Sequence, residues 1–343
     1  MIDEIGQLKR LWKRVFGDED AFIDLYFRER HDAEHTHLYK EGNEILAQLQ
    51  RIPYPFLYRG FCFNMEYVSG VLTSPEHRNK GLMKRLMKEA HRKMYQTGVH
   101  IATLIPAEEW LYGYYGNMEY STIFHCQNEM LTIDGFSAKQ TGLPQVALEE
   151  IDLDKFLFSP AHHFYEELLK RKKCAVLHTP EDLKIVLSDL SLAKGKIWIG
   201  KRDNKIVSVV IAVPSEDRWR ILEKLSIDAR MDKAMCLSLL QTTGKQALSV
   251  SQSGVKKGVP FGMARIINVE EVLRLYALSQ PPKEMTISVI GDTDIPENNG
   301  YFRIDNGVLK RSAPTSDAVP YTIADLNQLV FEEATPYISL MMN

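Results

Sequence analysis

Residues 71–87 could hold a phosphate group, because a strand pattern runs into a tight turn and then into a helix with a basic, glycine-bearing first turn. The start of a helix presents free backbone N–H groups and the positive end of the helix dipole, which suits a diphosphate. Gly81 lets that backbone approach a ligand closely, and Arg78, Lys80 and Lys84 add positive charge. The segment predicts a phosphate site, although a capped surface helix with solvated basic residues gives the same pattern.

Three carboxylates near this segment could act as acids or bases. Glu66 falls on a predicted strand, whereas Glu108 and Glu109 open a predicted short helix, where the dipole favours acidic side chains. We assign structural roles to all three. The histidines and cysteines have no partners at metal-ligand spacing, so we predict neither a metal site nor a disulfide framework. The residues considered are His77, His162, His163, Cys62, Cys126, Cys174 and Cys236.

The hydrophobic pattern predicts the elements that position these residues. Apolar residues recur at helical spacing over 5–16, and Gly17 followed by acidic residues predicts a stop and a capped second helix. Further strands and helices follow from alternation and from helical spacing. We expect strands at 36–39, 45–52, 61–73, 101–105 and 120–132, and helices at 79–95 and 108–115. This first part is therefore expected to be α+β with a largely antiparallel sheet.

Two further parts follow. One begins near Asp152 and resembles the first in element order, but it has no second Arg-x-x-Gly segment between strand and helix. The other begins near Pro260 and ends in an apolar tail over 336–343. The elements expected in them are strands at 196–201, 206–213, 264–267, 285–290, 300–304 and 307–311, and helices at 163–171, at 269–277 and from Thr322 or Asp325. The predicted domains are 1–135, 145–258 and 260–343.

Composition excludes several classes of protein. With 42 basic and 45 acidic residues the formal charge is −3, so nucleic acid is not expected as a partner. The first five residues lack the basic and apolar regions of a signal peptide, and no apolar run reaches the length of about 18 residues that a membrane span needs. The scattered cysteines fit a reducing compartment. We therefore expect a soluble, cytoplasmic protein.

Two segments resemble a known family. Arg78-x-x-Gly81-x-Met83, after Val71-Leu72-Thr73, resembles the coenzyme-binding segment of the GNAT superfamily of N-acetyltransferases, written Arg/Gln-x-x-Gly-x-Gly/Ala. Residues 104–116 resemble the strand, helix and tyrosine element of that family. Met83 replaces the usual small residue, and Leu or Met there is found in the enhanced-intracellular-survival acetyltransferases. That branch joins an active GNAT unit, a degenerate second unit and a sterol-carrier-like C-terminal α+β domain.

The resemblance implies acetyl-coenzyme A as cosubstrate and no metal. It places the pantetheine arm along residues 71–73 and the diphosphate on the backbone of residues 79–84. The coenzyme residues that it implies are Val71, Leu72, Thr73, Arg78, Asn79, Lys80, Gly81, Leu82, Met83, Lys84, Ala107 and Glu108. For Val71 and Leu72 the alternative is ordinary packing in a strand core, and both interpretations can hold together.

The resemblance also implies two catalysts. Tyr112 aligns with the tyrosine acid of the family, and a phenol with a pKa of about 10 is protonated at neutral pH and can donate. The alternative role of Tyr112 is aromatic packing. The α-carboxylate of Asn343 would be the base; an exposed carboxylate is a poor base, but burial beside Met341 and Met342 would raise its pKa. The alternative is a frayed chain end.

The expected function is N-acetyl transfer to a primary amine on a small molecule or peptide. A polyamine, an aminoglycoside-like drug and a lysine side chain all remain open, and the resemblance implies self-association into a homo-oligomer. A first rival is a non-catalytic acyl-coenzyme A sensor or lipid carrier that uses the third domain. A second rival is a structural protein with an inactive first unit, against which Arg78, Gly81 and Tyr112 together argue.

Overall fold

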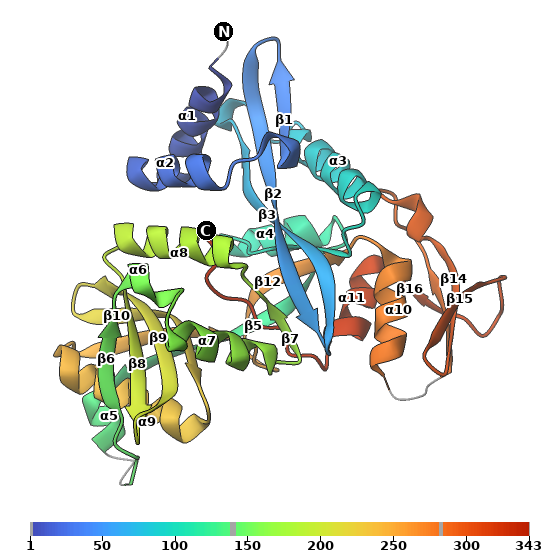
Figure 1. Cartoon of the computed structure of the whole chain (residues 1–343). Helices are drawn as coiled ribbons and strands as arrows, with labels where there is room; N and C mark the ends of the chain where they lie inside the picture. The colour runs from blue at the N-terminus through green and yellow to red at the C-terminus, as the bar shows by residue number, and fades with distance from the viewer. Residues whose placement is uncertain (1–2, 138–141, 281–283, 343) are drawn as a thin grey trace. The chain divides into compact units, whose positions relative to one another are not determined.

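The computed structural model describes residues 3–137, 142–280 and 284–342, and these form two compact units (Figure 1). The first unit comprises the described residues up to Ile123 together with those of Phe261–Thr335. The second comprises the described residues of Phe124–Pro260 together with Pro336–Met342. The predicted three-domain division is finer than this one and remains a prediction.

The first unit contains the predicted mixed sheet. Its strands run in the order β1-β2-β3-β4-β12, and only β3 and β4 pair in parallel. The bounds are β1 Thr36–Glu41, β2 Glu44–Tyr58, β3 Phe61–Thr73, β4 Ile101–Leu104 and β12 Val259–Ile266. The expected strands at 36–39, 45–52, 61–73 and 101–105 are confirmed. β12 enters the first unit at Phe261 and pairs antiparallel with β4.

Helices cover both faces of this sheet (Figure 1), with α1 and α2 on one side of β2 and β3 and α3 on the other. They are α1 Glu4–Phe16, α2 Asp20–Glu29, α3 Leu82–Gln96 and α4 Glu109–Gly116, with short 3-10 turns η1 Ala33–His35 and η2 Pro75–His77. The apolar face predicted for α3 is buried with β2 and β3 in one core that includes Leu49, Leu86, Met87 and Met94. The prediction that this helix starts at Asn79 is wrong, because Asn79 and Gly81 have φ angles of 62° and 76° and cannot continue a helix.

The C-terminal part of the first unit adds a small sheet in the order β15-β14-β13-β16. Its elements are α10 Val269–Ser279, β13 Met285–Val289, η3 Pro296–Asn298, β14 Gly300–Asp305, β15 Val308–Ser312, β16 Val319–Tyr321 and α11 Ile323–Phe331. Thr322, not Asp325, caps α11, and the two form a reciprocal capping box. Asn327 of α11 bonds the backbone of Ala264 and Ile266, which ties this helix to β12.

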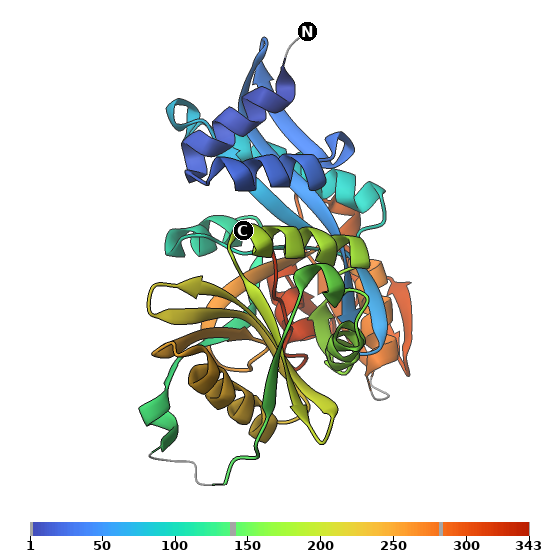
Figure 2. The same ribbon diagram turned by 60° about the vertical axis from the view of Figure 1, so that its left-hand side comes forward.

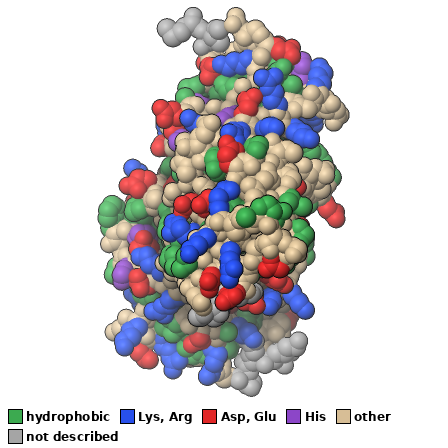
Figure 3. All heavy atoms as spheres, turned by 90° about the vertical axis from the view of Figure 1, so that its right-hand side faces the viewer, with side chains coloured by type: hydrophobic (Ala, Val, Ile, Leu, Met, Phe, Trp, Pro, Cys, Tyr) green, Lys and Arg blue, Asp and Glu red, His purple; other side chains and the backbone are tan. Residues whose placement is uncertain are grey.

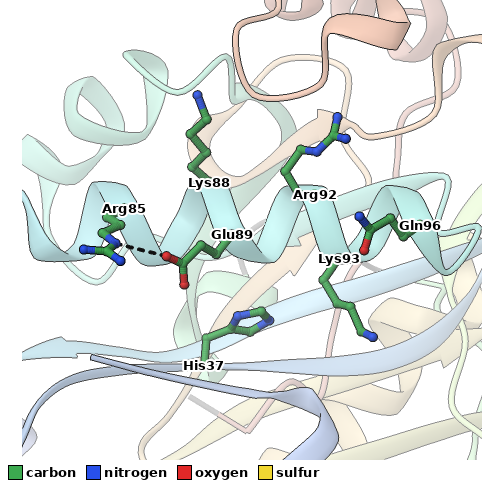
Figure 4. A pocket seen from close by; sticks show the side chains of 7 residues that line it. All are labelled: His37, Arg85, Lys88, Glu89, Arg92, Lys93 and Gln96. Atoms are coloured by element: carbon green, nitrogen blue, oxygen red, sulfur yellow. Dashed lines mark hydrogen bonds and ion pairs between the residues drawn. The ribbon is translucent and has the colours of Figure 1, made fainter. Parts of the chain in front are cut away.

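The C-terminal part of the first unit also contacts α3 through side-chain pairs. His91 Nδ1 lies 2.9 Å from Asp294 Oδ2, and Arg92 donates to both carboxylate oxygens of Glu297 at 2.5 and 3.0 Å. A hollow of about 570 Å³ lies along α3, and Figure 4 shows the side chains that line it, with His37 of β1 facing the helix. Three of its cations have acidic partners: Arg85 pairs with Glu89, Lys88 with Asp294 and Arg92 with Glu297. We therefore assign the hollow to packing rather than to anion binding.

Burial of His91 predicts a pH-dependent stability. Desolvation lowers the pKa of His91 from 6.5 to about 4, and the neutral ring donates to Asp294 and accepts from Tyr120. A lowered folded pKa means that stability is fully present above pH 6.5 and is lost as the pH falls toward 4, by up to about 3 kcal/mol. We expect His91→Gln to reduce the pH dependence of the urea-derived stability between these pH values, and His163→Gln, an exposed control, to leave it unchanged. An unaltered slope in His91→Gln would refute this account.

The second unit has the strand order β5-β11-β10-β9-β8-β6, with β10 and β11 parallel. Its strands are most of β5 Ser121–Thr132, then β6 Ala147–Ile151, β7 Cys174–Val176, β8 Lys196–Arg202, β9 Lys205–Ser215, β10 Arg218–Ser226 and β11 Ala247–Ser253. Its helices are α5 Ile133–Ser137, α6 Leu153–Phe156, α7 Pro160–Lys170, α8 Pro180–Leu192 and α9 Ala229–Thr243. Figure 2 shows α9, in dark gold, below the yellow strands. The predicted strands at 196–201 and 206–213 are confirmed as an antiparallel pair, and Asp203 and Asn204, both with positive φ, form the turn between them.

Candidate active site

The parallel pair β3–β4 separates where the predicted coenzyme segment begins. The two strands pair only over Met65–Tyr67 and Ile101–Thr103, although β3 continues to Thr73. β2 accompanies the opposite edge of β3 to its end. Residues 68–73 therefore have one edge that pairs with no described strand, and the backbone groups on that edge can bind an extended ligand.

A β-bulge shapes this open edge. The β2–β3 register shifts so that two residues of β3, Gly70 and Val71, lie opposite Leu49 alone. Gly70 has a φ of 58°, and a Cβ there would lie 2.6 Å from Trp12 Cζ3 of α1. The bulge therefore requires glycine for both its backbone and its packing. Sequence reasoning missed Gly70, although a glycine inside a strand pattern is the usual signal of a bulge.

The start of α3 has no side-chain cap. Gly81 is its N-cap residue, no side chain caps the helix, and no atom lies within 4 Å of the position that a Cβ would occupy. The preceding turn is fixed at both ends: Ser74 N–H donates to Leu46 O at 2.8 Å, and Arg78 Nε donates to Thr73 O at 3.4 Å. No side chain therefore caps the first N–H groups of α3, and the space beside Gly81 is open.

The remaining predicted coenzyme residues fall into three groups. The side chains of Arg78, Asn79, Lys80, Lys84, Ala107 and Glu108 are exposed. Leu72 and Met83 are buried, and Val71, Thr73 and Leu82 are half-buried. Met83 packs into the core beneath the helix, so its size does not obstruct the open helix start. Glu108 precedes α4 and accepts a hydrogen bond from Trp110 Nε1 at 2.9 Å.

Tyr112 borders the same core as the coenzyme segment. It is half-buried on α4, and together with Val71 and Leu82 it packs against the cluster beneath α3. Its hydroxyl donates to the backbone carbonyl of Phe261 in β12 at 3.1 Å. The structure thus brings a phenol and the predicted coenzyme segment to one core.

Neighbouring tyrosines pack against each other. The rings of Tyr114 and Tyr115 meet edge to face at 5.4 Å, and those of Tyr115 and Tyr120 at 5.9 Å. Burial raises the pKa of all three phenols. We assign these three to packing and retain Tyr112 as the candidate acid.

Of the rival carboxylates, Glu66 has a clear structural partner. Its side chain is buried, and its Oε2 lies 2.6 Å from Arg51 Nη1. The contact agrees with the structural role assigned to Glu66 from the sequence. Asn343, the candidate base, lies outside the described residues, and residues 336–342 belong to the second unit.

The described residues were also considered for a metal site and for a membrane-spanning helix. Among residues 3–137, 142–280 and 284–342, no cluster of three or more His, Cys, Asp or Glu side chains could hold a metal ion. None of the described helices has the length and apolarity to cross a membrane. Figure 3 shows basic and acidic side chains interspersed on one face.

The first third of the chain matches a known domain family. Residues 2–123 match the family model described as an acetyltransferase (GNAT) domain. No curated protein matches the chain in sequence. The sequence match covers the open strand edge, the start of α3 and Tyr112.

Solved structures share the fold over nearly the whole chain. A probable N-acyltransferase from Enterococcus faecalis has a TM-score of 0.79 at 16% identity, covering 95% of this chain and 86% of that one. A GCN5-related N-acetyltransferase from Anabaena variabilis has a TM-score of 0.79 at 15% identity, covering 98% and 97%. Eis1 from Mycobacterium abscessus has a TM-score of 0.71 at 12% identity, covering 96% and 88%. The chain therefore has the fold of GCN5-related N-acetyltransferases.

Proposed function

We propose that the chain is an N-acetyltransferase of the enhanced-intracellular-survival type, which transfers acetyl from acetyl-coenzyme A directly to a primary amine. The proposal rests on one observation. The unpaired edge of β3 is followed, after a short turn, by a helix whose first N–H groups have no side-chain cap. An extended amide-containing arm that ends in a diphosphate matches both features. The match of residues 2–123 to the GNAT domain supports the same function.

The coenzyme site is assigned to residues that fit each of its parts. The backbone of residues 71–73 would bind the pantetheine arm, because the bulge at Gly70 leaves this edge open. The backbone of residues 79–84 would hold the diphosphate, with Arg78, Lys80 and Lys84 supplying positive charge. Ala107 and Glu108, both exposed, complete the proposed coenzyme residues.

The chemistry needs one acid and one base. Acetyl-coenzyme A, when bound, supplies the activated thioester carbonyl. The α-carboxylate of Asn343 takes a proton from the attacking amine nitrogen, and Tyr112 gives its hydroxyl proton to the departing sulfur as the C–N bond forms and the C–S bond breaks. Tyr112 must turn its hydroxyl from Phe261 O toward the sulfur.

Three broader assignments belong to the same proposal. The described residues beyond 260 would form a sterol-carrier-like domain, the protein would act in the cytoplasm, and it would self-associate. The acceptor would be a small-molecule or peptide amine. A lipid-carrier function would instead require an apolar ligand to bind the third domain and no turnover to occur.

Substitution of Gly81 should weaken coenzyme binding. Valine at a φ of 76° is strained by about 1–3 kcal/mol, and its side chain would fill the space before the helix start. We expect Gly81→Val to raise KM for acetyl-coenzyme A at least about tenfold. Gly98→Val is the matched control, since Gly98 has the same φ of 76° and open space around it at the far end of α3. Equal KM values in the two variants would contradict the site.

Direct transfer is tested by intact-mass analysis. The protein is mixed with acetyl-coenzyme A, first alone and then with primary amines. We expect no acetylated protein without amine and acetylated amine when one is added. Rapid formation of an acetyl-enzyme that an added amine discharges would refute direct transfer.

A further inference from the structure

The second unit repeats the strand and helix plan of the coenzyme site. β8, β9, β10, α9 and β11 follow the order and pairing of β1, β2, β3, α3 and β4. β10 and β11 pair in parallel only over Arg218–Ile221 and Ala247–Val250. A bulge at Leu222 follows in β10, as the bulge at Gly70 follows in β3. The second unit therefore also has a slot between two separating strands.

The helix that follows β10 begins differently from α3. Asp228 caps α9, and its Oδ1 accepts from the N–H groups of Arg230 and Met231 at 2.8 and 2.9 Å. The carboxylate thus occupies the N–H groups that α3 leaves open and adds negative charge. A diphosphate would be repelled here, so the second slot does not suit a coenzyme.

The chain's own C-terminal segment lies in this slot. Ser253, at the end of β11, accepts from Ile338 N–H at 2.9 Å through its hydroxyl oxygen and donates to Ile338 O at 2.5 Å. Glu223, one residue past the bulge in β10, accepts from the hydroxyls of Tyr337 and Ser339. Residues 337–339 therefore bind both separated strands at once.

Several other elements also contact Tyr337 of this segment. Tyr337 N–H donates to Cys174 O at 3.0 Å, and Tyr337 O accepts from Val176 N–H at 2.9 Å, so the tail also extends along β7. Lys172 Nζ lies 3.9 Å from the centre of the Tyr337 ring. A Cβ on Gly254 would lie 2.8 Å from that ring. Glu223 itself is only 2% exposed, so a single buried carboxylate anchors the segment.

We infer that the β10–β11 slot is a docking site for residues 337–339 of the same chain, and that Glu223 is the positioning residue that holds the chain end. The docked segment leads to Asn343, the candidate base of the proposed function. Its catalytic consequence rests on the proposed function, whereas the docking does not.

The docking is tested on the full chain with Glu223→Leu, Glu223→Gln, Tyr337→Phe and the exposed control Glu216→Leu. Each variant is first shown to be folded in buffer without urea. It is then digested with a carboxypeptidase, and the loss of C-terminal residues is measured over time by intact-mass analysis. We expect Glu223→Leu to speed loss of residues 337–339 at least about tenfold, because two hydrogen bonds to a buried charge are lost. Glu223→Gln keeps an acceptor for Tyr337 and should restore part of the protection, and Glu216→Leu should match the wild type.

Equal digestion of Glu223→Leu and wild type would overturn the docking inference. If Glu223→Leu does not fold, Tyr337→Phe replaces it, since this change removes the hydroxyl that bonds Glu223 and keeps the ring. Faster digestion of Tyr337→Phe than of wild type would support the docking, and equal digestion would overturn it. The turnover of the same variants separates the two proposals. Faster digestion with a lower kcat and an unchanged KM for acetyl-coenzyme A would support both the docking and Asn343 as the base. Faster digestion with an unchanged kcat would support the docking and contradict Asn343 as the base.

Discussion

Tyr112→Phe is expected to lower kcat for amine acetylation about 10²- to 10⁴-fold, the usual contribution of a general acid. The change removes only the hydroxyl, whose hydrogen bond in the structure is to the backbone of Phe261. The ring still packs against the core beside Val71, so the coenzyme site should be preserved. Initial rates at saturating acetyl-coenzyme A, with calorimetric coenzyme binding, provide the measurement.

Tyr114→Phe is the matched control for this prediction. Tyr114 is half-buried on the same helix and packs edge to face with Tyr115. We expect less than about a threefold change in kcat, because packing is retained. Equal losses in the two variants, or full activity of Tyr112→Phe, would show that Tyr112 is not the acid.

Arg265→Met is expected to destabilise the first unit by about 3–5 kcal/mol, the cost of breaking a buried ion pair. Arg265 is 1% exposed, and its Nη2 lies 2.7 Å from Asp292 Oδ1. Asp292 also accepts from the N–H groups of Asp294 and Ile295 and from Asn298 Nδ2. Removing the guanidinium leaves the buried carboxylate with these neutral donors only. Urea unfolding followed by tryptophan fluorescence measures the change.

Two comparisons sharpen this second prediction. Arg303→Met removes an exposed arginine whose Nη2 lies 3.9 Å from Glu284, and should change stability by less than about 1 kcal/mol. Arg265→Met combined with Asp292→Leu removes both charges and should recover part of the loss. If Arg265→Met is as stable as Arg303→Met, the buried pair does not hold this part of the unit together.

The elements that position the site could largely be predicted from local patterns. The apolar face of α3 and the strand pattern over 61–73 appear directly in the sequence, because each repeats with the period of its own backbone. Gly81 could be found locally as well, since a glycine directly before a basic helix start is typical of a phosphate-binding turn. The helix start was misplaced because the left-handed conformation of Asn79 has no signal in a hydrophobic pattern.

Long-range pairings could not be predicted in the same way. β12 follows β4 in the first-unit sheet although more than 150 residues separate them in the chain, and no local pattern specifies such a neighbour. The contacts of His91 with Asp294 and of Glu223 with Tyr337 are likewise set by tertiary packing. The bulge at Gly70 depends on its approach to Trp12, which is a property of the folded unit.

The most direct test of the proposed function is the initial rate of free-thiol release from acetyl-coenzyme A by the intact chain, with and without primary amines. The panel contains a polyamine, an aminoglycoside and a lysine peptide. We predict that at least one amine accelerates release well above the amine-free rate and that acetylated amine forms in equal amount. Tight coenzyme binding with no amine-dependent release would contradict the enzyme and favour an acyl-coenzyme A sensor or lipid carrier.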